Sequence, residues 1–173
     1  MTRVIFAIVL VMSYYFGFSQ DDQNKTEVSV ETSVFGVQVG LIGVWAHNEL
    51  RLSNQVALRS ELGINGVNTN TISPSIALEP RWYYNLGKRQ EKGKRIDGNS
   101  GNYFSLRATY FFHDDEELNK DYTDEISVIP TWGIRRNIGK HFNYEVGAGA
   151  GLGFESKNID IDLYVNLRFG YRF

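Results

Sequence analysis

Charged residues at alternating positions are the side chains of this 173-residue chain that are most able to do chemistry. The set has six acids and seven bases: Glu49, Glu61, Glu79, Glu125, Glu145 and Asp162, with Arg51, Arg59, Arg81, Arg107, Arg135, Arg168 and Arg172. Carboxylates arranged in this way can perform general acid–base catalysis. Every base, however, is arginine, whose planar guanidinium is always charged and pairs bidentately with carboxylates. Because buried charge is tolerated only when it is paired, we predict a structural Arg/Glu network.

A histidine offers the second possible chemistry. His113 stands beside Asp114 and near Ser105 and Thr109, which could supply a nucleophile. The glycine-rich run 147–153 looks like a phosphate-binding loop, but its strict period of two predicts a strand. The chain has no cysteine, which excludes a disulfide framework and a thiolate metal site. We predict no cofactor and no enzymatic activity, with the His113 group as the alternative.

The last strand shows what must position these charges. From Asp160 to Phe173, polar residues alternate with Ile161, Leu163, Val165, Leu167, Phe169, Tyr171 and Phe173. Successive side chains of a strand point to opposite faces, so the segment has one apolar and one polar wall over about 45 Å. Such a segment is typical of a barrel strand that faces lipid on one side and a polar lumen on the other.

The same alternation recurs along the chain. Predicted strands cover 37–52, 56–65, 72–86, 104–112, 125–138 and 142–155. Residues 37–44 are apolar on both faces, which predicts a bulge. Because bacterial barrels normally have an even number of strands, residues 25–34 are the candidate eighth strand, with a turn near Phe35–Gly36. The alternative is that 20–34 form a disordered tail outside an odd or differently closed barrel.

The amino terminus has the pattern of a secretory signal peptide. Arg3 precedes the apolar run 4–12, and Gly17 and Ser19 supply small residues before a cleavage site at Gln20. We predict a signal peptide over 1–19 and one domain over 20–173. The alternative is an uncleaved anchor. The chain's formal charge of −2 is too mild to indicate a nucleic-acid partner.

These features predict an all-β fold, a closed antiparallel up-and-down transmembrane β-barrel of eight strands. Such a barrel has room inside for side chains alone, so the Arg/Glu network would leave no wide pore. A soluble lipocalin-like barrel inverts the same pattern, with the apolar face around a ligand. Arginine rather than lysine on the strands, glycine on the polar face and the terminal Phe173 favour the membrane barrel.

Two charged connections could contact partners. If the carboxyl terminus is periplasmic, the connections at 53–54, 87–101 and 137–141 face the periplasm, and those near Phe35 and at 66–70, 114–124 and 155–159 face outside. The 87–101 connection is basic and is expected to be a solvated loop, with contact to lipid phosphates as the alternative. The acidic 114–124 connection is likewise expected to be solvated, with divalent cations as the alternative ligand. The extracellular loops could also bind a surface partner.

Three stretches carry a family resemblance. The segments Asn48–Gly63, Glu79–Leu86 and Leu167–Phe173 resemble small outer-membrane β-barrel proteins of the OmpA/OmpX type. The resemblance implies location in the cell outer membrane, contact with outer-membrane lipid, and a monomer. It also implies insertion by the barrel-assembly machinery, which would read Leu167, Phe169, Tyr171 and Phe173 as the assembly signal.

The resemblance leaves several roles open. The expected role is structural, adhesive or envelope-maintaining. A lipid-modifying barrel enzyme and a narrow transport barrel are the alternatives. Small barrel enzymes of the lipid A deacylase and palmitoyltransferase kinds use a histidine with a serine and an acid, but this chain has no His-x-Ser-Asn stretch of the deacylase kind.

Overall fold

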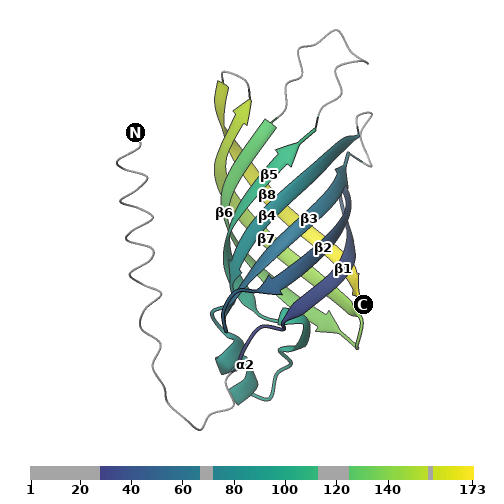
Figure 1. Ribbon diagram of the computed structural model, residues 1–173, viewed down its shortest axis with the longest axis vertical. Coiled ribbons are helices and arrows are strands. Elements are labelled where there is room, and N and C mark those ends of the chain that lie inside the picture. Colours follow the sequence, from purple (N-terminus) through teal and green to yellow (C-terminus); the bar gives the residue numbers. More distant parts are fainter. Residues whose placement is uncertain (1–27, 67–71, 113–124, 156–157) are drawn as a thin grey trace, which may run out of the picture.

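The computed structural model, which describes residues 28–66, 72–112, 125–155 and 158–173, is a closed barrel of eight antiparallel strands (Figure 1). Each strand pairs with the next along the chain, and the first pairs with the last, so the predicted up-and-down barrel is confirmed. The strands are β1 (Ser33–Gly40), β2 (Gly43–Arg51), β3 (Val56–Asn65), β4 (Ser73–Trp82), β5 (Asn102–Phe111), β6 (Glu125–Ile138), β7 (Phe142–Glu155) and β8 (Asn158–Arg172). The predicted signal peptide (1–19), His113 and the acidic connection 114–124 lie outside the described residues.

Side-chain alternation sorts the residues of each strand into lumen and outer wall. On β2, for example, Trp45, His47 and Glu49 are buried, whereas Val44 and Leu50 are exposed. The outer wall is therefore apolar on strand after strand, and the buried interior is mostly polar and charged. This arrangement is the reverse of a soluble globular core.

The assignment of the first two strands from sequence was wrong, although the count of eight was right. The predicted strand 37–52 is divided by a two-residue turn, Leu41–Ile42, between β1 and β2. The expected bulge and the expected turn near Phe35–Gly36 are both absent from this described part of the chain. Gly40 and Gly43 flank the turn, where a Cβ would lie 2.8 Å and 2.4 Å from backbone oxygens of β8 and β3. The turn was missed because its two residues are apolar rather than the polar residues that usually mark a turn.

Residues 28–32 form neither the predicted first strand nor a tail. Val30 is buried, and its N–H donates to the Asn54 carbonyl at 2.8 Å. The Arg51 N–H donates to the Thr32 carbonyl at 3.1 Å. This segment therefore packs against the end of the barrel before β1 begins.

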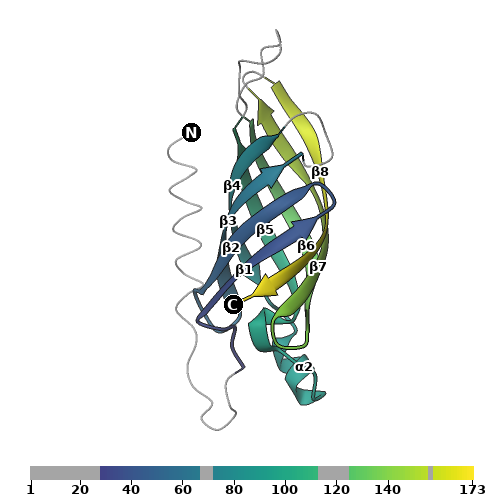
Figure 2. The same cartoon turned by 90° about the vertical axis from the view of Figure 1, so that its right-hand side faces the viewer.

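The connection between β4 and β5 closes the same end of the barrel. It contains α2 (Leu86–Glu91) and the short 3₁₀ helix η1 (Asp97–Asn99), which lie below the strands (Figures 1 and 2). Val30, Ala57, Tyr83, Leu86 and Tyr103 form a small apolar core there. The connection is thus a folded cap rather than the solvated loop expected from its charges, although Lys88, Lys92 and Lys94 remain exposed. No helix in the described part of the chain has the length and apolar character to cross a bilayer.

Candidate functional site

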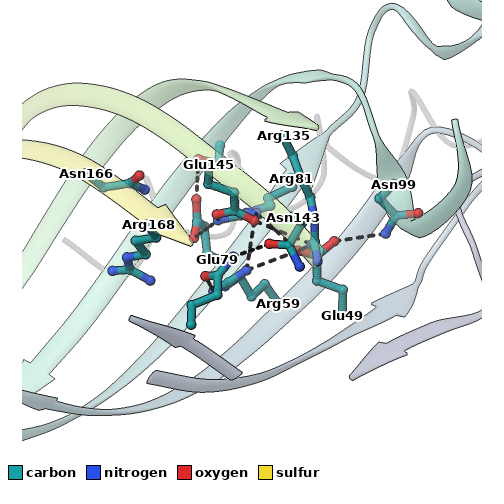
Figure 3. A network of polar contacts seen from close by, with 12 residues as sticks. Glu49, Arg59, Glu79, Arg81, Asn99, Arg135, Asn143, Glu145, Asn166 and Arg168 are labelled. Carbon is teal, nitrogen blue, oxygen red and sulfur yellow. Dashed lines mark hydrogen bonds and ion pairs between the residues drawn. The ribbon is translucent and has the colours of Figure 1, made fainter. Parts of the chain in front are cut away.

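A cluster of four glutamates and five arginines fills the middle of the lumen (Figure 3). We call it the lumen cluster; its members are Glu49, Arg59, Glu61, Glu79, Arg81, Arg107, Arg135, Glu145 and Arg168. Seven strands, β2 to β8, each supply at least one member. The remaining strand, β1, supplies Gln38, whose Oε1 accepts from Arg59 Nη2 at 2.6 Å. The cluster therefore links the full circumference of the barrel.

Two carboxylates from opposite parts of the sequence form the centre of the cluster. Glu49 Oε1 lies 2.6 Å from an Nη1 donor of Arg135, 3.1 Å from that of Arg81 and 3.3 Å from that of Arg59. Glu145 Oε1 accepts from Arg81 Nη1 at 3.1 Å and from Arg59 Nη1 at 3.2 Å. Three guanidinium groups thus share two carboxylates, and none of these five side chains is exposed. Such sharing satisfies the rule that buried charges require partners.

The upper part of the cluster is built around Glu61 and Glu79. Glu61 Oε2 accepts from Arg59 and Arg168, each at 2.7 Å, and Arg107 donates to Glu61 Oε1. Glu79 Oε2 accepts from Arg81 at 3.0 Å and from Arg107 at 3.2 Å. Arg107 therefore bridges the two glutamates across the lumen.

Aromatic rings support the arginines from the side. The Arg168 Cζ lies 3.8 Å from the ring centroid of Trp45, and the Arg81 Cζ lies 4.2 Å from that of Tyr103. These distances are within the range of cation–π attraction. Close approach of the same rings requires glycine on the neighbouring strands. A Cβ on Gly63 would lie 2.3 Å from Trp45, and one on Gly133 would lie 2.5 Å from Tyr103.

Four of the thirteen charged residues singled out in the sequence lie outside this cluster. Arg51 is exposed at the last position of β2, so the expectation that it joins the lumen charge network was wrong. Glu125 and Asp162 are half-buried toward the upper end of the lumen. Arg172 lies at the capped end, where it donates to Glu31 at 3.0 Å and to Asp97 at 3.1 Å.

The cap is hydrogen-bonded directly to the lumen cluster. Tyr83 Oη and Asn99 Nδ2 each donate to Glu49 Oε2 at 2.9 Å. Asn99 adopts a left-handed backbone conformation, with φ of 59°, and its side-chain oxygen accepts from the Glu31 N–H at 2.8 Å. Sequence analysis missed Tyr83, Asn99 and Gln38. No pattern signals them, because their positions depend on how the β4–β5 connection folds.

Asp97 ties the cap to the last strand. Hydrogen bonds from the Arg95 guanidinium lower the pKa of Asp97 below its ordinary value, with smaller contributions from Asn137 and Arg172. The carboxylate form is therefore favoured in the folded cap. Exposed Arg95 and half-buried Arg172 hold it from two sides.

The glutamates of the lumen cluster are all engaged in ion pairs. Each of its glutamates is fully or almost fully shielded and is held by at least two guanidinium groups. Ser105, considered above as a nucleophile, donates its hydroxyl to Glu79 Oε1 at 2.7 Å. Within the described residues, no group of three or more His, Cys, Asp or Glu side chains is placed to hold a metal ion.

The cluster also divides the lumen into two unlike halves. The cap closes the lower half. The upper half contains a cavity of about 390 Å³, lined by side chains that include Trp45, Arg107, Ile129, Asn166 and Arg168. Comparisons with protein-family models, with curated proteins and with solved structures found no match for this chain.

Proposed function

We propose that the chain is a small integral outer-membrane barrel protein of the OmpA/OmpX type, with a structural or envelope-maintaining role. The observation that carries the proposal is the pairing of an apolar outer wall with a charged, tightly paired lumen. In water, such an outer wall would be far larger than the apolar patches that soluble monomers expose. In a bilayer, lipid chains cover it, as in other transmembrane barrels.

The outer wall is apolar on every strand. Its exposed members include Val37 and Val39 on β1, Leu62 and Ile64 on β3, Leu78 on β4, Leu106 on β5, Ile126 on β6, Leu152 on β7 and Leu163 and Val165 on β8. Where Gly36–Gly40 of β1 pair with Arg168–Arg172 of β8, the backbone groups are also satisfied without water. A lipocalin-like barrel would instead hold its apolar faces inside, so the observed distribution argues against that alternative.

Aromatic residues gather near the capped end of the outer wall. Trp82 and Tyr84 lie 5.9 Å apart between ring centroids, and Phe104 lies 5.3 Å from Tyr84. The Trp132 indole N–H donates to Tyr84 Oη at 3.0 Å. Amphipathic rings of this kind favour the level of lipid head groups. This cluster supports an interface at the capped, periplasmic end.

The terminal strand supports the proposed partners. Leu167, Phe169, Tyr171 and Phe173 all present exposed side chains on the outer wall. Phe173 also packs against Phe35 of β1, with ring centroids 5.4 Å apart, at the seam where the barrel closes. We propose that these residues are read by the barrel-assembly machinery and that the closed barrel is a monomer among outer-membrane lipids.

The lumen cluster and the cap argue against an open pore. Nine charged side chains fill the middle of the lumen, and Tyr83 and Asn99 seal its lower side. A rigid, closed barrel of this kind anchors surface loops to the membrane rather than admitting solutes. The structural role is therefore favoured over transport.

A carbonate wash of cell envelopes tests the proposal directly. The expressed chain is expected to remain in the outer-membrane pellet, and the unboiled protein is expected to migrate differently from the boiled one on a gel. Release of a folded chain into the soluble periplasmic fraction would refute it. The matched control is a variant with Leu78→Glu and Leu106→Glu, which places charge on the lipid-facing wall and is expected to abolish insertion.

A further inference from the structure

The barrel wall has a gap above its seam. β1 pairs with β8 only between Gly36–Gly40 and Arg168–Arg172. In the described part of the chain, Asn158–Leu167 of β8 pair with β7 alone. Figure 2 shows the cause: the β1–β2 turn ends well below the upper end of β8. The upper part of β8 therefore has one edge without a partner strand, and we call this part of the wall the gap.

The upper cavity lies directly behind this gap. Its lining combines Leu41 and Ile42 of the β1–β2 turn with Leu163, Val165 and Leu167 of β8. All five are exposed and belong to the outer wall. The same cavity reaches inward to the polar side chains above the lumen cluster. A single space thus joins the lipid-facing surface to a polar floor.

Two atoms at this floor have no hydrogen-bond partner among the described residues. They are Asn166 Oδ1 and Arg168 Nε, and their residues are 5% and 2% exposed. Their other polar atoms are occupied: Asn166 Nδ2 and Arg168 Nη2 each donate to Tyr164 Oη at 3.1 Å. Buried polar atoms without partners are costly, and a ligand that hydrogen-bonds to both would remove this cost. One acceptor and one charged donor stand two residues apart on the same face of β8.

A carboxyl group matches this pair of atoms. Its hydroxyl can donate to Asn166 Oδ1, and its carbonyl can accept from Arg168 Nε. The apolar gap suits one hydrocarbon chain, and about 390 Å³ is near the lower limit for ligand cavities. Both ends of the cavity therefore fit a molecule with an acid head and a single apolar tail.

We propose that the upper lumen binds a long-chain fatty acid. The carboxyl group lies at Asn166 and Arg168, and the hydrocarbon chain passes between the β1–β2 turn and β8 into the bilayer. The inference rests on the proposed function, because the tail needs lipid outside the gap. Phospholipids with two chains are expected not to enter, because a cavity of about 390 Å³ is near the lower limit for ligand cavities.

Fluorescence quenching can detect this binding, because Trp45 lines the cavity. The other two tryptophans, Trp82 and Trp132, are on the outer wall and are replaced by Phe to leave Trp45 as the single reporter. This variant is refolded into phosphatidylcholine vesicles and titrated with a stearic acid brominated in its chain. A phosphatidylcholine with bromines at the same chain position is the comparison probe. We expect saturable quenching by the fatty acid and weak, unsaturable quenching by the phospholipid.

Two matched pairs of variants locate the head and the tail. Asn166→Leu removes the free acceptor and is expected to weaken fatty-acid binding about tenfold. Asn143→Leu makes the same change in the lumen outside the cavity and is expected to bind normally. Val165→Phe narrows the gap and is expected to reduce quenching several-fold. Ile161→Phe changes the same outer face but lies outside the cavity lining, so it is expected to leave quenching unchanged. Both β8 positions are highly exposed, so the larger ring does not disturb packing.

The outcomes separate this inference from the proposed function. Vesicle flotation is measured first, and a chain that does not float with vesicles refutes the proposed function. If the chain inserts but the fatty acid and the phospholipid quench Trp45 equally, the site is wrong while the membrane barrel stands. Equal binding by the Asn166→Leu and Asn143→Leu variants would also overturn the assigned head-group site.

Discussion

Removing the charge of Glu49 tests the lumen cluster most severely. Glu49 Oε1 lies within 3.3 Å of donors on Arg59, Arg81 and Arg135, and its Oε2 accepts from Tyr83 and Asn99. Glu49→Gln keeps the shape of the side chain. It leaves Glu145 as the one carboxylate of the lumen cluster that contacts all three guanidinium groups. Breaking a buried pair by neutralising one partner costs about 3–5 kcal/mol.

The assay is equilibrium unfolding in urea of the barrel refolded into vesicles, followed by tryptophan fluorescence. A loss of 3–5 kcal/mol lowers the folding equilibrium constant by about two to three and a half powers of ten. Asp162→Asn is the matched control, because Asp162 was also expected in the network but is half-buried outside the cluster. We expect a change of at most about 0.5 kcal/mol for this control.

The result that would refute the reasoning is a small effect. If Glu49→Gln costs less than about 1 kcal/mol, the carboxylate is solvated rather than buried and paired. An additional measurement uses Arg135→Gln and the double variant. Because Glu49 and Arg135 lie 2.6 Å apart, the double variant should cost clearly less than the sum of the two single variants. Additive costs would show that this pair is not coupled.

Three further predictions address packing, pH and the closed lumen. Gly133→Val should destabilise the barrel by about 1–3 kcal/mol in the same urea titration, because a Cβ at this position would lie 2.5 Å from Tyr103. Gly87→Ala is the control and should not destabilise the barrel, because the space around Gly87 is open. The folded cap lowers the pKa of Asp97. The ionised Asp97 carboxylate therefore stabilises the cap at pH values above its ordinary pKa of about 4, and this stabilisation is lost as the pH falls through the lower pKa of the folded state. Asp97→Asn should therefore remove an acid-induced increase in amide hydrogen exchange within the cap, and an unchanged pH profile would contradict this. In planar bilayers the barrel should show no sustained conductance. Replacing Arg81 and Glu145 together by Ser should introduce a conductance. Equal currents through the original barrel and the double variant would mean that the lumen cluster does not block the lumen.

The sequence by itself determined the wall of this barrel. Period-two alternation from Asp160 to Phe173, repeated in 56–65, 125–138 and 142–155, assigned most residues correctly to the lumen or the outer face. The pattern is reliable because side-chain direction in a strand is a local property of the backbone. The same reasoning placed arginine and glutamate together inside, since unpaired charge cannot remain there.

Only the tertiary structure decided which charges meet. Alternation says that a side chain points inward but not at which level of the barrel it lies, because the level depends on strand register. Arg135 therefore reaches Glu49, while Arg172 lies at the capped end and pairs with Asp97. The division of 37–52 into two strands, the folded cap and the gap beside β8 likewise arise from contacts between segments distant in sequence, which no local pattern encodes.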